Sequence, residues 1–114
     1  MSRYVLVLPL AVAGLCVGAC APRPTASVAD SDPMVKIPAM KAAVRQNDHK
    51  PLADLVADLD SDDPAVRFYA ITALHQLTGQ RHGYDYFAAD DRRQEAMGRW
   101  RQWLQQRSGA GAQP

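Results

Sequence analysis

The chain has 114 residues, of which 47% are hydrophobic and 22% charged, and 13 basic against 12 acidic residues give a formal net charge of +1. This near balance gives no electrostatic reason to expect binding to nucleic acid or general attraction to an anionic membrane surface. The length allows one small domain.

Residues 1–19 combine one charged residue, Arg3, with an uncharged and mostly apolar stretch that ends in VGAC at residues 17–20. The apolar core is shorter than the ~20 residues that a membrane-spanning helix needs, and small residues follow it instead of a basic cluster. The small residues before Cys20 resemble the lipobox of a bacterial lipoprotein, in which the cysteine is acylated and becomes the new N-terminus. The resemblance implies a cleaved signal peptide over 1–19 and a lipid on Cys20. The alternatives are an uncleaved membrane anchor and a cytosolic protein with an apolar N-terminus.

Cleavage has consequences for the remaining chain. Without Arg3, 12 basic and 12 acidic residues remain, so the formal net charge is zero. The lipid consumes the only remaining thiol, so no internal disulfide is expected. Ala21 after the cysteine resembles the pattern of lipoproteins sent to the outer membrane. The expected location is therefore the cell envelope, anchored in the outer membrane and facing the periplasm.

Segments on both sides of the expected domain are rich in proline, serine or glycine and poor in large apolar residues. Residues 20–34 are predicted to form a flexible tether after the lipidated cysteine, because they cannot bury enough surface to offset the entropy lost on ordering. Residues 108–114 are predicted to form a disordered tail. The folded domain is therefore expected over residues 35–107.

Apolar residues at helical spacing predict four helices in this domain, and no stretch has the alternation typical of a strand. The predicted helices cover residues 35–46, 49–60, 64–78 and 91–107.

Residues at the expected helix ends support these bounds. Asp48 is the expected N-cap of the second helix. Asp63 is the expected N-cap of the third, with Pro64 in its first turn. Gly79 is expected to end that helix in a left-handed conformation.

The stretch from Pro51 to Gly79, PLADLVADLDSDDPAVRFYAITALHQLTG, resembles one HEAT-type repeat: a helix, an Asp-rich turn, and a second helix that opens with Pro-x-Val-Arg. The resemblance implies an antiparallel hairpin in which Asp63 and Pro64 cap the second helix and Arg67 joins acidic groups of the turn. Solenoids of this kind usually need three or more repeats, whereas this chain has one clear unit. The first and fourth helices are therefore expected to act as caps.

The predicted fold is all-α, with a HEAT-like antiparallel helix hairpin flanked by an N-terminal and a C-terminal helix. Trp100, Trp103 and Phe87 are expected to close the core, since a buried aromatic ring contributes a few kcal/mol at ~25 cal/mol per Å². Trp100 aligns with other apolar residues of its helix and is expected to be structural.

Two charge clusters are expected on neighbouring helices, where they would partly satisfy each other. Asp58 and Asp60 lie at the C-terminal end of the second helix, where the helix dipole disfavours negative charge. At least one of them is therefore predicted to lie within ion-pair reach of a basic side chain, with Arg67 or an arginine of the fourth helix as the expected partner. The clusters comprise Asp54, Asp58, Asp60, Asp62 and Asp63, and Arg92, Arg93, Arg99, Arg101 and Arg107.

The acidic turn is an incomplete calcium-binding motif. Asp58, Asp60 and Asp62 match the first three ligand positions of such a loop, but the glycine of the sharp turn and the final glutamate are missing. A solvated, capping acidic turn is therefore the expected interpretation.

Other catalytic and metal motifs are also incomplete. A three-ligand zinc site could be formed only by His75, His82 and Asp85. The chain after residue 20 offers neither a free cysteine nor an H-x-x-x-H helix to support such a site. The serines after residue 20 lie in the tether, the acidic turn or the tail, not at a nucleophile elbow. We expect no metal, no cofactor, no small-molecule substrate and no enzymatic activity.

Five residues are the candidates for a binding surface, although the three loop residues and the tryptophan among them also have a structural explanation in loop or core packing. The leading interpretation is a membrane-anchored periplasmic module that binds another envelope protein or a second copy of itself. One alternative is a structural lipoprotein that contacts peptidoglycan or anionic lipid, and another is a small metal-binding protein or hydrolase. The candidate residues are Tyr84, Asp85, Tyr86, Arg99 and Trp103.

Overall fold

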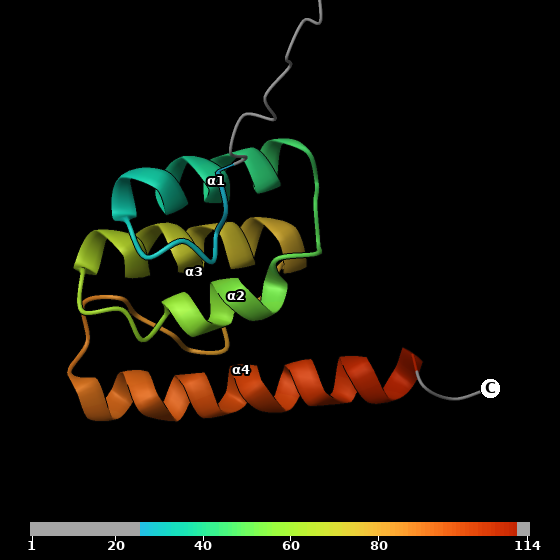
Figure 1. The fold of residues 1–114 in the computed structure, drawn as a ribbon. Helices are drawn as coiled ribbons and strands as arrows, with labels where there is room; N and C mark the ends of the chain where they lie inside the picture. Colours follow the sequence, from blue (N-terminus) through green and yellow to red (C-terminus); the bar gives the residue numbers. More distant parts are fainter. Residues whose placement is uncertain (1–25, 112–114) are drawn as a thin grey trace, which may run out of the picture.

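A computed structural model of the protein describes residues 26–111, and this part of the chain is all-α, without a strand, as predicted (Figure 1). Cys20 and the predicted signal peptide lie outside the described residues. The four helices are α1 (Pro33–Arg45), α2 (Leu52–Asp58), α3 (Pro64–Thr78) and α4 (Asp90–Gly111).

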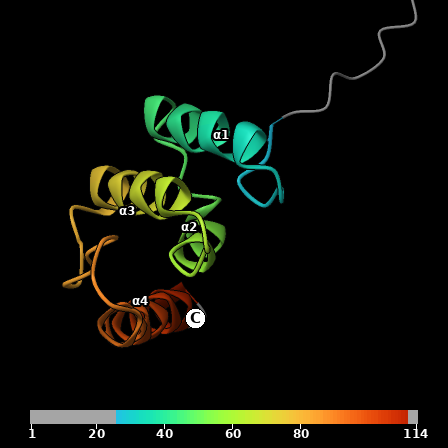
Figure 2. The same ribbon diagram turned by 90° about the vertical axis from the view of Figure 1, so that its left-hand side faces the viewer.

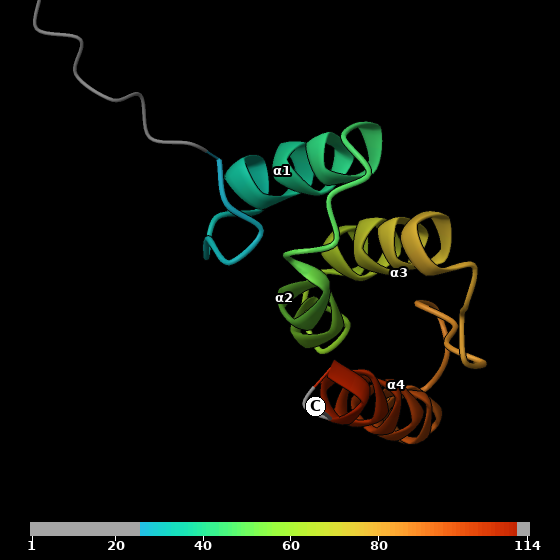
Figure 3. The same ribbon diagram turned by 90° about the vertical axis from the view of Figure 1, so that its right-hand side faces the viewer.

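The helices are stacked in layers. Helices α1, α3 and α4 run in one direction and α2 runs in the opposite direction, so α2 and α3 form an antiparallel hairpin (Figure 1). Views nearly along the helix axes show α1 at one end of the stack, the hairpin in the middle and α4 at the other end (Figures 2 and 3). The contacts follow the same order, because α1 packs on α3, α3 on α2, and α2 on α4.

Each layer contributes large side chains to one buried core. Met40 of α1, Leu55 of α2 and Leu74 of α3 are almost completely inaccessible to solvent. Trp100 of α4 is fully buried, and Trp103 is only partly buried against the same core. This core holds the terminal helices on the hairpin.

Phe87 does not close the core, so that expectation is wrong. Phe87 is 81% exposed, whereas Tyr84, three residues earlier, is buried in the core. The reason is a turn in which Asp85 Oδ1 accepts a hydrogen bond of 2.9 Å from the backbone N–H of Phe87. This turn follows Tyr84 directly and leaves the Phe87 ring outside.

The folded part begins earlier than predicted. Asp32 is the N-cap of α1, because its Oδ1 accepts a hydrogen bond of 2.9 Å from Met34 N, and Pro33 occupies the first turn. Val28 lies in the core and is only 6% exposed. The end of the expected tether is therefore part of the folded unit.

Helix α2 is shorter than predicted, and Asp48 is not its N-cap. Lys50 precedes Pro51, and a residue before proline is disfavoured in the α conformation. The helix therefore begins at Leu52, after an N-cap position held by Pro51 without a side-chain hydrogen bond. Asp48 instead accepts a local hydrogen bond from the backbone N–H of Lys50 at 3.0 Å.

Helix α3 has the predicted bounds. Asp63 Oδ1 accepts a hydrogen bond of 2.8 Å from Ala65 N, Pro64 follows it, and Gly79 ends the helix with φ +73°. Helix α4 starts one residue before the predicted bound and continues to Gly111, into the expected tail.

The acidic segment has a different basic partner from the one expected. Asp58 does lie within ion-pair reach of a basic side chain, but this is Lys36 of α1 at 2.7 Å. Asp60 accepts a hydrogen bond from Gln94 Nε2 at 2.6 Å. Within residues 26–111, the only other ion pair joins Arg93 and Asp90, so the two charge clusters do not pair directly.

Arg67 binds backbone carbonyls instead of the acidic side chains that the resemblance implied. Its Nη1 donates to the carbonyls of Ser61 at 2.8 Å and Asp62 at 3.2 Å, and its Nε donates to the carbonyl of Tyr86 at 3.1 Å. Arg67 thereby joins the α2/α3 turn to the loop before α4.

Candidate protein-interaction surface

An aromatic patch with two exposed rings and one, Tyr86, partly buried against the core lies where α3 meets the loop before α4. We define the aromatic patch as Phe68, Tyr86 and Phe87. The Phe68 and Tyr86 rings have centroids 5.1 Å apart, and the Tyr86 and Phe87 centroids are 5.8 Å apart, both with edge-to-face geometry. Phe68 is 42% exposed and Phe87 81% exposed, so neither ring belongs to the core.

The patch is held by polar contacts beneath it. Phe68 is next to Arg67 on α3, and Arg67 donates to the carbonyl of Tyr86. Asp85 fixes the backbone of Phe87 from the preceding turn. Because these contacts fix the loop, the rings are presented on a preorganised surface, which lowers the entropic cost of binding.

Tyr84 belongs to the core and is unavailable to a partner. Its hydroxyl donates a hydrogen bond of 2.5 Å to the carbonyl of Leu59, and the side chain is buried. Burial raises the pKa of Tyr84 to about 12, more than the nearby charges of Arg67 and Arg93 lower it. Of the three candidate residues in the loop, only Tyr86 contributes its ring to the patch.

Arg99 and Trp103 line a second surface feature, a pocket of about 260 Å³ on α4, together with His82, Gln102 and Gln106. Arg99 Nε donates a hydrogen bond of 2.7 Å to the carbonyl of His82. The structure thus brings Arg99 and Trp103 together in this pocket. Neither residue belongs to the aromatic patch.

The pocket wall includes a turn with an uncommon backbone. His82 and Gly83 have φ +51° and +72°, and Tyr84 N donates a hydrogen bond of 3.0 Å to Arg81 O across them. A non-glycine residue with positive φ is uncommon, although histidine is among the more tolerant types. The His82 ring lies edge-on to Trp100, with centroids 4.5 Å apart. His82 is therefore a packed, partly buried residue and not a surface histidine.

Sequence reasoning missed Phe68 and assigned Phe87 to the core. A signal for Phe68 was present, since Val66, Ala70 and Leu74 define the buried stripe of α3 and position 68 lies off that stripe. An aromatic residue outside the core stripe of a helix is a candidate contact residue.

Residues 26–111 contain neither a cluster of metal ligands nor a membrane-spanning helix. In the part of the chain that the structure describes, no three His, Cys, Asp or Glu side chains form a group that could hold a metal ion. Among residues 26–111, no helix combines the length and the apolar content that crossing a bilayer requires.

Comparisons with protein-family models, with curated proteins and with solved structures found no match to this chain.

Proposed function

We propose that this protein is a lipid-anchored helical module of the cell envelope that binds another envelope protein, or a second copy of itself, without catalysing a reaction. The anchor is a lipid on Cys20, the membrane is the outer membrane, and the domain faces the periplasm. The proposal combines the lipobox-like sequence before Cys20 with the aromatic patch on the folded domain.

The observation that carries the binding proposal is the exposure of Phe87 and Phe68, at 81% and 42%. Aromatic rings are enriched at protein interfaces because they bury large apolar areas with few rotatable bonds. Polar residues fix the backbone beneath this patch, so the rings are a surface feature of the folded state and not the result of poor packing.

We further propose that the domain is a capped, single HEAT-like unit. The antiparallel α2/α3 hairpin and the Asp63-Pro64 start of α3 support this assignment, whereas the contacts of Arg67 differ from those of the repeat pattern. Helices α1 and α4 would then replace the neighbouring repeats of a solenoid.

Photo-crosslinking in intact cells tests the partner. A photoreactive amino acid at Phe87 should give a defined crosslinked product, whereas the same amino acid at the exposed Gln105 of α4 should give much less. Mass spectrometry of the product distinguishes another envelope protein from a second copy. If both positions crosslink equally and without a defined product, the aromatic patch is not the binding surface.

The anchor is tested separately. Labelled palmitate should appear on the wild-type protein and not on Cys20→Ser, and the Cys20→Ser protein should leave the membrane after a carbonate wash. A Cys20→Ser protein that stays on the membrane would show that another segment holds it there.

The α4 pocket favours a second candidate function, contact with peptidoglycan or anionic lipid. A guanidinium, two amides and an indole ring together offer hydrogen bonds, charge and an apolar face to an anionic glycan. Salt-sensitive sedimentation with purified cell wall, reduced by Arg99→Ala, would support this function. A protein partner should instead survive as the Phe87 crosslink.

A further inference from the structure

A shallow groove of about 270 Å³ runs between α1 and α3. Its floor consists of the buried Met40 and Ala73 and the partly buried Val44 and Tyr69. Residues 26–28 lie on the other side of α1, beside Pro51. Among the described residues, only side chains of α1 and α3, which lie next to each other in the stack (Figure 3), line the groove.

Positive charge borders the groove along α1. Lys41 and Arg45 are exposed residues at its edge, and Lys41 Nζ lies 4.7 Å from the centroid of the Tyr69 ring. Neither cation takes part in the ion pairs found within residues 26–111. The opposite edge, on α3, is formed by the uncharged Thr72 and Gln76.

The surrounding helices add no negative charge. Helices α1 and α3 contain no aspartate or glutamate, although the chain has 12 acidic residues. The groove therefore combines an apolar floor with uncompensated positive charge on one edge, and a complementary partner must be apolar on one face and acidic beside it.

We infer that this groove binds an acidic amphipathic helix of a partner protein. The apolar face of that helix lies over Met40 and Ala73, and its carboxylates pair with Lys41 and Arg45. Docking of an apolar helix face into a groove between helices is a recurrent mode of recognition. The groove adjoins the aromatic patch, because the Tyr69 ring of its floor lies 5.3 Å from the Phe68 ring, centroid to centroid. The inference goes beyond the proposed function because it names an occupant for the groove itself, and substitutions at Lys41, Arg45 and Thr72 test it without changing the aromatic patch.

The spacing of the two cations matches that of carboxylates on a helix. Lys41 and Arg45 are four residues apart on α1, so they lie on the same face one turn apart. A helix that lies alongside α1 presents carboxylates at i and i+4 with the same spacing.

The test uses the full-length protein in nanodiscs of phosphatidylcholine, a neutral lipid, with empty nanodiscs as background. The probe is a fluorescent peptide of about four helical turns, with leucines on one face and glutamates beside them. A matched peptide carries lysine in place of each glutamate. Fluorescence anisotropy should show binding of the glutamate peptide, weakening with added salt, and little binding of the lysine peptide.

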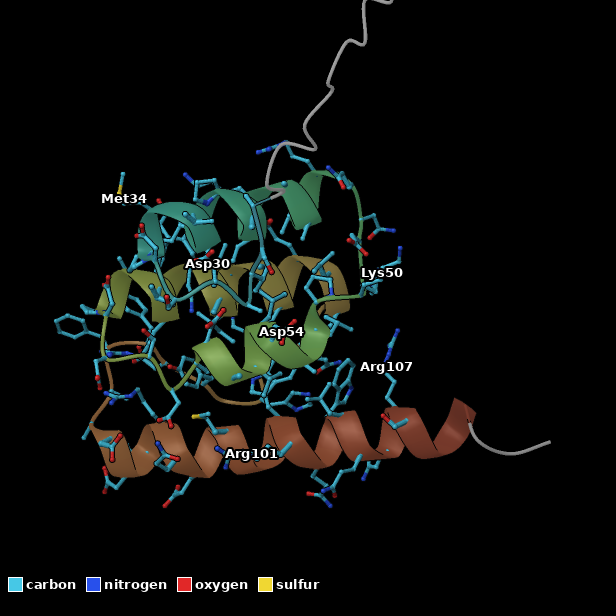
Figure 4. All side chains as sticks on the ribbon, in the orientation of Figure 1. Asp30, Met34, Lys50, Asp54, Arg101 and Arg107 are labelled. Atoms are coloured by element: carbon cyan, nitrogen blue, oxygen red, sulfur yellow. The ribbon has the colours of Figure 1, made fainter. Side chains whose placement is uncertain are left out.

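Matched variants locate the site. Lys41→Glu with Arg45→Glu should weaken binding of the glutamate peptide about tenfold or more, because it replaces two attractive pairs by repulsive ones. Thr72→Trp, which fills the groove from its uncharged edge, should also weaken it. Arg92→Glu with Arg101→Glu makes the same charge change on α4, at the opposite end of the stack from α1 (Figure 4), and should leave binding within about twofold of wild type.

Three outcomes would overturn the inference: equal binding of both peptides, equal loss in the α1 and α4 charge variants, or no effect of Thr72→Trp. A fourth is binding of the protein to phosphatidylglycerol vesicles that depends on Lys41 and Arg45 when the glutamate peptide does not bind. That result would assign the groove to an anionic lipid surface.

Discussion

Lys36 of α1 donates a hydrogen bond of 2.7 Å to Asp58 at the end of α2, and the two side chains are only 13% and 10% exposed. The second carboxylate oxygen of Asp58 has no hydrogen-bond partner among the described residues. Burial raises the pKa of the Asp58 carboxyl above its ordinary value of 3.8, and this effect exceeds the opposing effect of Lys36. The pair therefore joins α1 to the hairpin while the aspartate charge itself is unfavourably placed.

The stability of wild type relative to Asp58→Asn should fall as the pH rises from about 3 to 7. The folded-state pKa of Asp58 is raised, so the folded protein keeps a proton that the unfolded chain has already released. The resulting stabilisation is complete below pH 3.8 and is lost as the pH rises through the folded-state pKa. Urea unfolding of both proteins at several pH values measures the difference. A difference that stays constant with pH would contradict the raised pKa.

Breaking the pair from one side should cost more than removing it. Lys36→Met alone leaves a buried carboxylate without its cation, and we expect a loss of about 3 kcal/mol or more in the free energy of unfolding. Lys36→Met with Asp58→Leu should recover most of that loss. Lys41→Met, on the exposed surface of the same helix, is the control and should change stability by less than about 0.5 kcal/mol. A double variant no more stable than the single one would show that the pair is worth more than apolar packing.

Tyr84→Phe should lower the free energy of unfolding by about 1–2 kcal/mol, because it leaves the buried carbonyl of Leu59 without its donor. The pKa of Tyr84 is raised to about 12, so the wild type should also lose stability as the pH rises through that value, and the variant should lose less. Chemical unfolding at neutral and alkaline pH measures both effects. Tyr86→Phe is the matched control in the same loop. An equal effect of the two substitutions would argue against the Tyr84–Leu59 hydrogen bond.

The two glycines with positive φ should respond differently to alanine. At Gly79, with φ +73°, an added Cβ meets no atom within 4 Å, so the cost should be about 1 kcal/mol from the backbone conformation alone. At Gly83, with φ +72°, the added Cβ lies 3.0 Å from Arg99 Nη2, so the cost should be larger. Thermal unfolding measures both, and Gly83→Ala combined with Arg99→Ala should remove the excess. Equal costs at the two positions would show that Arg99 moves aside freely.

Trp100→Ala should cost about 3–5 kcal/mol, enough to unfold much of so small a domain, because the ring is fully buried. Phe87→Ala should change stability by less than about 0.5 kcal/mol, because most of its ring is already in solvent. Circular dichroism during urea unfolding measures both. A large loss of stability in Phe87→Ala would mean that the ring has a structural role and would weaken the proposed interaction surface.

Local signals predicted most of the fold. The Asp63-Pro64 start and the Gly79 end of α3 act within a few residues, and the structure has both. The start of α2 was wrong because the restriction that Pro51 places on Lys50 outweighed the N-cap preference of Asp48.

The candidate surface was harder to predict, because it depends on contacts between distant segments. Tyr84 is buried and Phe87 is exposed, the reverse of what was predicted. The difference follows from the direction of one loop, which the hydrogen bonds of Arg67 and Asp85 fix. The partner of Asp58 was also non-local, since Lys36 lies 22 residues earlier in the chain. Helix periodicity contains no information on which of several cations reaches a given carboxylate.

The burial of Val28 limits the distance between the folded domain and the proposed lipid anchor. With a lipid on Cys20, as proposed, only eight peptide units would separate the bilayer surface from a residue fixed in the core. Fully extended, a chain segment of this length spans at most roughly 29 Å. Residue 28 would therefore stay within that distance of the bilayer surface, and a protein that docks on this domain would be held near the membrane.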